Sequence, residues 1–139
     1  MGIDKDRITF LMGEIQNALS ILKEFREEER GKVISDPKSL GSIKYYLIIA
    51  TEACIDICNH IIAKESFGVP ESYADCFKIL GEREIISRNL SRKLINMAKF
   101  RNLLVHLYWK VDDQKVNEIL EKELTDFDEF IKQIARKYL

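Results

Sequence analysis

Three side chains that can take part in chemistry fall within eight residues late in the chain: Arg101, His106 and Tyr108. The guanidinium of arginine is a planar cation with several donors, which suits binding a phosphate and stabilising negative charge on it. Imidazole can accept and return a proton near neutral pH, and a phenol offers a hydroxyl that donates and accepts hydrogen bonds. This stretch is therefore the first candidate for a functional site.

Arg101 continues an apolar stripe that recurs every three or four residues, at positions 90, 94, 97, 101, 104 and 108. On an ideal helix, Arg101 and Tyr108 lie about 20° apart, whereas Arg101 and His106 lie about 140° apart. The pattern predicts that Arg101 and Tyr108 share the inward face and that His106 lies round the side. A site that uses both Arg101 and His106 then needs an unwound helix near Leu104, side chains that reach round the helix, or a second, two-fold-related copy.

A charged guanidinium on a core-facing stripe is costly unless it is paired. An earlier helical segment carries a polar stripe, Glu52, Asp56 and then Asn59 and His60, whose spacing puts it on one face. Two interpretations stay open, because this stripe either faces water or faces the cation. Equally, an ion pair of Arg101 either only fixes the fold or holds a functional group in place.

Other chemical motifs are missing from the sequence. It has no glycine-rich phosphate loop, no Gly-x-Ser-x-Gly and no His-Glu-x-x-His. The three cysteines, Cys54, Cys58 and Cys76, contain no Cys-x-x-Cys pair and are interpreted as buried free thiols in a reducing cytosol. We expect no metal site and no cofactor.

The composition favours a soluble globular protein, with 46% hydrophobic and 32% charged residues in a chain of 139. We expect one domain over residues 1–139. The net charge of −1 gives no global basic field, so an RNA ligand must meet a local cationic site. No apolar run is long enough to span a bilayer and no signal peptide opens the chain, so we expect a cytoplasmic protein without membrane contact.

Helical periodicity throughout predicts an all-α fold, an antiparallel bundle of about five helices, four long and one short. The second helix is apolar nearly all round, so it must be central or covered by a second subunit. The expected helices are Asp4 to about Arg30 with Gly31 after it, Asp36-Pro37 to about Lys64, a short helix from Ser72 to Gly81, one that begins near Ile85 or Ser87 and carries the motif, and a last one from Asp112-Asp113 to Tyr138.

The pattern Arg-x4-His-x-Tyr, formed by Arg101, His106 and Tyr108, resembles the motif of the HEPN superfamily and specifically of its HepT toxin branch. Residues 100–112 are similar to the motif region of that branch, and residues 53–63 to its second helix. Residues 70–80 are similar to its connector and short helix. The three blocks stand in the right order, and the resemblance covers essentially the whole chain.

This resemblance implies a metal-independent ribonuclease toxin that forms a homodimer, with the active cleft at the dimer interface. It also implies a minimal nucleotidyltransferase antitoxin as partner and RNA as substrate. By the same resemblance, Arg101 would bind the scissile phosphate and His106 would act as general base or acid. Asn102 would orient the phosphate or His106.

Tyr108 would be the hydroxyl to which the antitoxin transfers AMP, which would block RNA by bulk and charge. Glu52, Asp56 and His60 would support the site by holding Arg101. Two other hypotheses stay open beside the ribonuclease. One is a non-catalytic helical module that binds a nucleotide or a nucleotidyltransferase, and the other is a structural bundle in which Arg101 only forms an ion pair.

Overall fold

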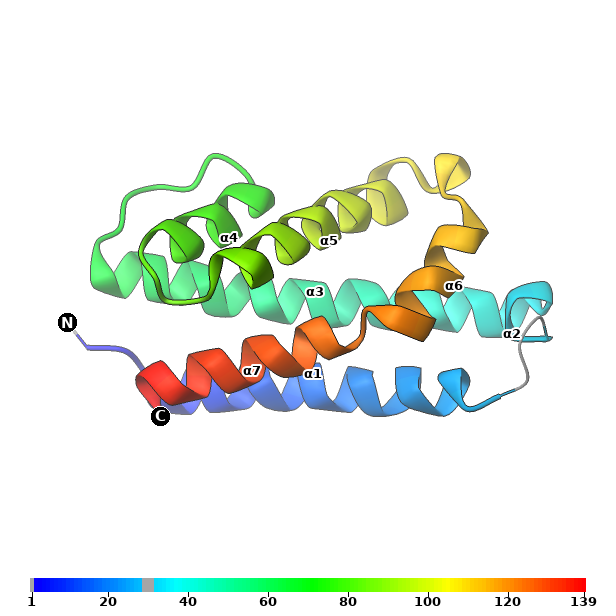
Figure 1. The fold of residues 1–139 in the computed structure, drawn as a ribbon, viewed down its shortest axis with the longest axis horizontal. Coiled ribbons are helices and arrows are strands. Elements are labelled where there is room, and N and C mark those ends of the chain that lie inside the picture. The colour runs from blue at the N-terminus through cyan, green and yellow to red at the C-terminus, as the bar shows by residue number, and fades with distance from the viewer. Residues whose placement is uncertain (1, 29–31) are drawn as a thin grey trace.

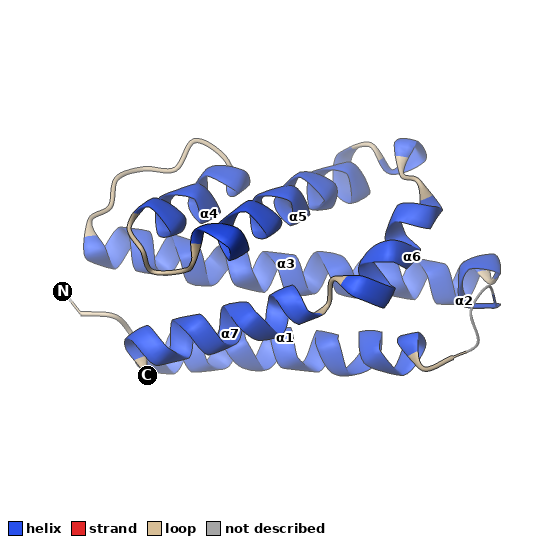
Figure 2. Ribbon diagram, in the orientation of Figure 1, coloured by secondary structure: helices blue, strands red, loops and turns tan. Residues whose placement is uncertain are grey.

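A computed structural model describes residues 2–28 and 32–139, which form helices and no β-strand (Figure 1). The helices are α1 (Lys5–Arg26), α2 (Lys32–Ser35), α3 (Pro37–Glu65), α4 (Tyr73–Glu82), α5 (Arg88–His106), the 3₁₀ helix η1 (Tyr108–Lys110), α6 (Asp113–Lys122) and α7 (Thr125–Tyr138). Long neighbours run antiparallel and the connections between them are short (Figure 2). The predicted all-α bundle is therefore confirmed.

Helix α3 lies at the centre of the bundle, as its nearly all-round apolar sequence predicts. It contacts α1, α2, α4, α5, α6 and α7. Helices α1 and α7 lie along one side of it, and α4 and α5 along the other (Figure 1). Its length and composition alone would also suit a membrane span, but 56% of its most apolar window is buried in the fold. Core packing thus accounts for its apolar character.

The helices begin where capping residues stand in the sequence. The side chains of Asp36, Ser72, Ser87 and Asp112 each accept a hydrogen bond from a backbone N–H in the first turn of the helix that follows. Such caps satisfy donors that have no partner inside the helix. The predicted starts of α3, α4, α5 and the last helical region are confirmed.

The last helical region differs from the prediction of one long helix. It is divided into α6 and α7 at Glu123 and Leu124, where Glu123 has φ −117° and ψ 3°. Neither proline nor glycine marks this bend. Across the bend, the buried apolar positions 120, 124, 127, 130 and 134 keep a spacing of three or four. A prediction from apolar periodicity therefore does not detect the bend.

Two further helix boundaries differ from the prediction. Helix α1 ends at Arg26, while the predicted end at Arg30 and Gly31 lies outside the described residues. One turn of helix, α2, precedes α3 and was not predicted. Neither difference changes the placement of the motif, which lies on α5.

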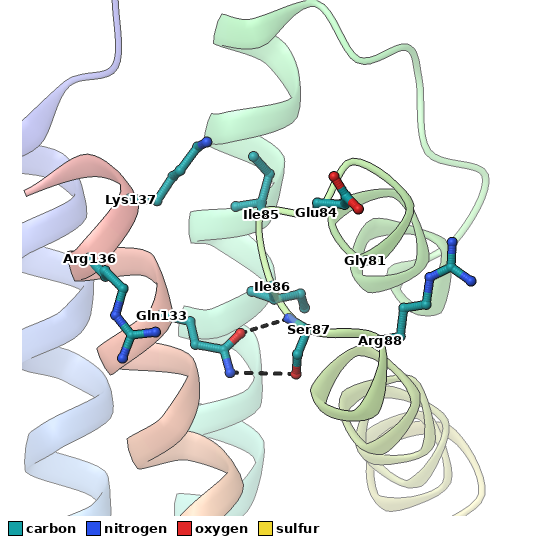
Figure 3. A pocket seen from close by; sticks show the side chains of 9 residues that line it. All are labelled: Gly81, Glu84, Ile85, Ile86, Ser87, Arg88, Gln133, Arg136 and Lys137. Carbon is teal, nitrogen blue, oxygen red and sulfur yellow. Dashed lines mark hydrogen bonds between the residues drawn. The ribbon is translucent and has the colours of Figure 1, made fainter.

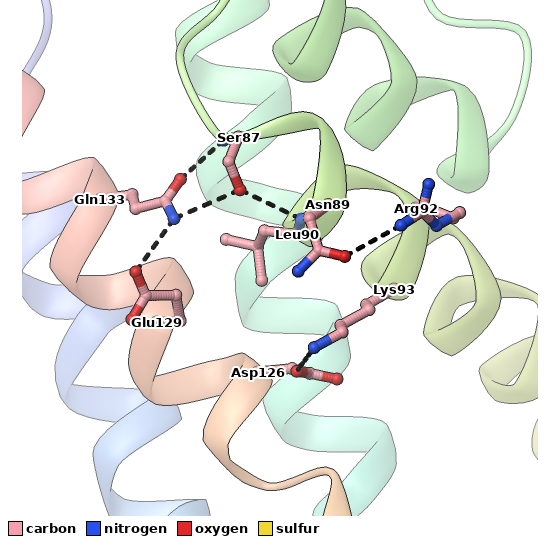
Figure 4. A network of polar contacts seen from close by, with 8 residues as sticks. All are labelled: Ser87, Asn89, Leu90, Arg92, Lys93, Asp126, Glu129 and Gln133. Atoms are coloured by element: carbon pink, nitrogen blue, oxygen red, sulfur yellow. Dashed lines mark hydrogen bonds and ion pairs between the residues drawn. The ribbon is translucent and has the colours of Figure 1, made fainter.

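Helix α5 is fixed at its N-terminal end by contacts to α4 and α7. The hydroxyl of Ser91 donates to the carbonyl of Phe77 over 2.8 Å, close beside Gly81 of α4. On the other side, the Ser87 N–H donates to the side-chain carbonyl of Gln133 over 2.7 Å (Figure 4). These contacts set the direction in which α5 presents its C-terminal residues.

Candidate functional site

The guanidinium of Arg101 is held by three helices. Arg101 is 8% exposed, and its Nη2 donates to the Glu52 carboxylate of α3 over 2.5 Å. Its Nη1 donates to the side-chain oxygen of Asn102 over 3.1 Å. The guanidinium carbon lies 4.9 Å from the ring centroid of Tyr73, the first residue of α4, a cation–π contact. The cation therefore has a fixed position and orientation.

This arrangement leaves part of the cation available to a ligand. A guanidinium has five N–H donors, and the two contacts above use one on each terminal nitrogen. The remaining nitrogen, Nε, is buried and has no hydrogen-bond partner among the described residues. The side chain of Glu52 is 41% exposed, so the ion pair is open to solvent on one side. One N–H on each terminal nitrogen remains for an anion.

His106 is the last residue of α5 and is exposed. Because α5 is continuous from Arg101 to His106, the angular separation of about 140° between them applies. Arg101 points into the bundle and His106 points out of it. A single chain therefore does not bring these two side chains onto one face, and the helix does not unwind near Leu104.

The position of Tyr108 differs from the prediction. Leu107 has φ −134° and ψ 45°, outside the α-helical region, so α5 ends before Tyr108. The helical periodicity that placed Tyr108 beside Arg101 therefore does not extend to Tyr108. The prediction that the two side chains share an inward face is wrong. Tyr108 lies on η1 and is 68% exposed.

Trp109, which sequence reasoning did not single out, packs against Tyr108. The two ring centroids lie 5.3 Å apart, with the rings nearly perpendicular. Trp109 is 66% exposed and is the one tryptophan in the sequence. Two features of the sequence could have identified Trp109 as a candidate: it is the sole tryptophan, and it lies three residues after His106. Two exposed aromatic rings therefore stand next to the outward-facing histidine.

The acidic stripe contributes one residue to the Arg101 contact. Glu52 forms the ion pair that the sequence analysis anticipated. Asp56 is exposed, and its charged neighbours are Arg7 of α1 and Glu52. Partial burial of the carboxyl group raises the pKa of Asp56, Arg7 opposes that shift and Glu52 adds to it. Within the stripe, Glu52 is thus the residue that orients the cation.

His60, near the C-terminal end of α3, contacts the N-terminal segment of the chain and not Arg101. Its Nε2 accepts a hydrogen bond from the backbone N–H of Asp4 over 3.0 Å. Partial burial lowers the pKa of His60, with help from Lys64 and Arg7, while Asp4 opposes the shift. The ring therefore anchors the segment before α1, and no contact joins it to Arg101 in the described structure.

The three cysteines match the interpretation as buried free thiols. Cys54, Cys58 and Cys76 are all buried and none forms a disulfide. Burial raises the pKa of Cys76 to about 11 and also raises the pKa of the other two thiols. Thiols of this kind are poor nucleophiles. Among residues 2–28 and 32–139, no group of three or more His, Cys, Asp or Glu side chains could hold a metal ion.

A cavity of about 530 Å³ lies between the α4–α5 connection and α7 (Figure 3). Its lining includes Ile85, Arg88 and Arg136. This cavity adjoins the N-terminal end of α5, while His106 stands at the C-terminal end. The lining of this cavity therefore includes none of Arg101, His106 and Tyr108.

Known proteins are similar to this chain in sequence and in fold. The mRNA nuclease HepT of Shewanella oneidensis is 39% identical over 80 residues, which cover 58% of this chain and 60% of that relative, less than two thirds of its length. The tRNA nuclease HepT of Aphanizomenon flos-aquae is 27% identical over 116 residues, covering 84% of this chain and 79% of that protein.

A solved structure of the tri-AMPylated Shewanella oneidensis HEPN toxin in complex with MNT antitoxin superposes with a TM-score of 0.89. It is 29% identical in sequence, and the match covers 94% of this chain and 98% of that one. The family model described as ribonuclease HepT-like matches residues 15–134, which include Glu52, Arg101, His106 and Tyr108. The chain therefore belongs to the HepT-like ribonuclease family.

Proposed function

We propose that this protein is an endoribonuclease toxin that cleaves RNA without a metal ion and is neutralised by a minimal nucleotidyltransferase antitoxin. Arg101 and His106 are the proposed catalytic residues. The observation that carries the proposal is the guanidinium of Arg101, which Glu52 holds at a fixed position with two N–H donors left over. A preorganised cation of this kind is what stabilises a phosphate in a charged transition state.

The proposed reaction is transfer of the phosphodiester to the neighbouring ribose hydroxyl. His106 takes the proton from the 2′-hydroxyl, and the 2′-oxygen forms a bond to the adjacent phosphorus. The bond from phosphorus to the 5′-oxygen of the next nucleotide breaks, and that oxygen takes a proton from water. The products are a 2′,3′-cyclic phosphate and a free 5′-hydroxyl. Arg101 stabilises the negative charge that grows on the phosphate oxygens, and Asn102 helps to orient its guanidinium.

The proposed active site is composite and lies at a homodimer interface. Its support is the opposite orientation of Arg101 and His106 on one helix, which a two-fold-related copy can resolve. A second support is the groove of about 410 Å³ between α1 and α3, which Glu52 lines together with the exposed rings of Phe10 and Tyr45. Exposed apolar side chains beside the residue that holds Arg101 are suited to cover by a second subunit.

Tyr108 is the proposed site of neutralisation. The antitoxin would transfer AMP from ATP to the Tyr108 oxygen, with release of pyrophosphate and of the hydroxyl proton. The exposure of this side chain makes it accessible to an enzyme, and its place two residues after His106 puts the added phosphate near the site. The relative whose structure matches carries three AMP groups and is in complex with MNT antitoxin, which supports the proposal.

RNA is the proposed substrate class. The two nuclease relatives are named for different RNAs, one for mRNA and the other for tRNA. Their common chemistry is the ribose 2′-hydroxyl next to a phosphodiester, which both kinds of RNA share. The proposed substrate is therefore single-stranded RNA in general, because the reaction requires only this shared chemistry.

A non-catalytic module that binds a nucleotide or a nucleotidyltransferase is the second candidate. The observation in its favour is that Arg101 is already paired and does not face His106 within one chain. In that case the motif would be a docking surface for a nucleotide phosphate or a nucleotidyltransferase. Wild type and a variant without His106 would then leave RNA equally intact.

The deciding experiment compares the wild-type protein with His106→Ala on total bacterial RNA in the presence of EDTA. We expect cleavage by the wild type, with 2′,3′-cyclic phosphate ends, and no cleavage by the variant. Because His106 is exposed, the variant should unfold at the temperature of the wild type, which separates a chemical loss from a folding loss. Equal cleavage by both proteins would contradict the assignment of His106.

A further inference from the structure

The charge of the chain is distributed unevenly, and α5 is its basic element. Between Ile85 and Val111 the sequence has six basic residues and no acidic one, while the rest of the chain has 16 basic and 23 acidic residues. The six are Arg88, Arg92, Lys93, Lys99, Arg101 and Lys110. A chain with a net charge of −1 thus carries one strongly cationic helix, and that helix ends at His106.

Three of these cations lie in line with His106. Successive residues of a helix are separated by about 100°, so Arg88, Arg92 and Lys99 fall within about 40° of each other. His106 follows Arg88 by 18 residues, which is five turns, and therefore shares its angular position. The stripe formed by Arg88, Arg92 and Lys99 extends about 27 Å along α5 from Arg88 to His106.

The charges of this basic stripe are not neutralised within the fold. All three side chains are exposed. Arg88 and Lys99 have no ion-pair partner in the described part of the chain, and Arg92 donates to the amide oxygen of Asn89 over 2.9 Å (Figure 4). By contrast, Lys93, which points to α7, pairs with Asp126 over 3.7 Å (Figure 4). Of the six basic residues, the three of the stripe and Lys110 are thus the ones without an ion-pair partner in the described part of the chain.

A shallow groove runs beside the stripe, between α4 and α5. Its first part has a volume of about 320 Å³ and includes Arg88, Arg92 and Lys78. Its second part, about 250 Å³, includes Lys78 and Lys99. Acidic residues of the α4 side also line these parts, Glu82 in the first and Glu71 and Asp75 in the second. The positive charge is therefore concentrated on the α5 wall.

We propose that the basic stripe of α5 is the track on which single-stranded RNA lies as its phosphodiester reaches His106. This inference rests on the proposed ribonuclease function and adds the surface that binds the substrate outside the catalytic residues. Phosphates on the track would meet Arg88, Arg92 and Lys99 in turn, each as a sequence-independent electrostatic contact. The RNA then arrives at a site flanked by the exposed rings of Tyr108 and Trp109.

The test compares two triple variants that lose the same charge at different places. The track variant carries Arg88→Gln, Arg92→Gln and Lys99→Gln. The matched control carries Lys5→Gln, Lys122→Gln and Lys132→Gln, three exposed lysines of α1, α6 and α7. Both sets are made in the His106→Ala background, so that a short single-stranded oligoribonucleotide of mixed sequence stays intact. Binding is followed by fluorescence anisotropy of the labelled RNA over a range of salt concentrations.

We expect the track variant to bind RNA more weakly and the slope of log affinity against log salt to become shallower by about 2, since each phosphate contact on a single strand contributes about 0.7. The matched control should keep the slope of its parent. Trp109, the sole tryptophan, should change its emission when RNA binds to the parent. In the His106-intact background, the track substitutions should raise KM and leave kcat unchanged.

Equal losses of RNA affinity in the two triple variants would overturn the proposal, because net charge, and not the position of the charges, would then determine the affinity. An unchanged slope in the track variant would overturn the proposal too. The binding readout does not require cleavage. A protein that binds RNA through the stripe yet cleaves none therefore contradicts the ribonuclease proposal alone, and one that cleaves RNA with the track removed and KM unchanged contradicts the track alone.

Discussion

The Arg101 guanidinium and the Glu52 carboxylate join α5 to α3 by an ion pair of 2.5 Å, in which the arginine side chain is 10% exposed and the glutamate side chain 41% exposed. A pair that is buried on one side and open on the other serves two purposes. It compensates the burial of a charge, and it leaves N–H donors of a fixed cation within reach of solvent.

Replacement of Glu52 tests this orienting role. Glu52→Ala should lower the free energy of unfolding by about 1–3 kcal/mol, because a mostly buried guanidinium loses its partner. It should also lower kcat by about tenfold to a hundredfold through misplacement of Arg101. Glu52→Gln, which retains an acceptor oxygen without the charge, should lie between the alanine variant and the wild type. A wild-type kcat in Glu52→Ala would show that Arg101 needs no orientation by α3.

Stability should depend on pH through His60. Its folded pKa lies below the ordinary value of 6.5, and the neutral ring accepts the Asp4 hydrogen bond. The unfolded chain therefore binds this proton more readily than the folded one. The contribution of His60 to stability is fully present above pH 6.5 and is lost as the pH falls through the window below that value.

Thermal unfolding of the wild type and His60→Gln over this pH range measures that contribution. The melting temperature of the wild type should fall more steeply with decreasing pH than that of the variant. His106→Gln, which changes the other, exposed histidine, should retain the wild-type pH dependence. If His60→Gln and the wild type have parallel curves, the Asp4 contact does not contribute.

The contact between α4 and α5 leaves no space for a side chain at Gly81. A Cβ atom there would lie 2.5 Å from the Ser91 hydroxyl oxygen and 2.6 Å from its Cβ. We expect Gly81→Ala to destabilise the fold by about 1–3 kcal/mol, measured by denaturant unfolding. Gly41→Ala, in α3 with nothing near its Cβ, should instead be neutral or stabilising. A destabilised Gly81→Ala that Ser91→Gly rescues would identify this contact as the cause.

Modification of Tyr108 is tested by intact-mass measurement. After incubation with ATP and the partner nucleotidyltransferase, the wild type should gain one or more AMP units and lose RNA cleavage. Tyr108→Phe should gain none, remain folded because the side chain is exposed, and still cleave RNA in the presence of the enzyme. A mass gain in Tyr108→Phe would show that AMP is attached to another residue.

Much of the fold could be predicted because its determinants are local. The caps at Asp36, Ser72, Ser87 and Asp112 and the periodic apolar positions act within a few residues, so the sequence contains them directly. Glu52 was found as a partner of Arg101 by a physical requirement, since a cation on a core-facing stripe needs a counter-charge. That requirement does not depend on knowledge of the fold.

The remaining features depend on tertiary packing. The bend at Glu123 and Leu124 leaves the apolar spacing intact, and the end of α5 at Leu107 is marked by neither glycine nor proline. The position of Tyr108 depended on that end, which is why its predicted face was wrong. Likewise, spacing alone could not show that His60 contacts Asp4, because the segment before α1 reaches it from 56 residues away.

Heterodimers of two inactive variants test whether the active site is composite and lies at the dimer interface. Arg101→Ala and His106→Ala chains with different affinity tags are co-expressed, and heterodimers are isolated by both tags. If each site combines Arg101 of one chain with His106 of the other, a heterodimer retains one intact site of two. We expect about half of the wild-type cleavage rate for the heterodimer and none for either variant homodimer. A heterodimer as inactive as the two homodimers would contradict the composite site.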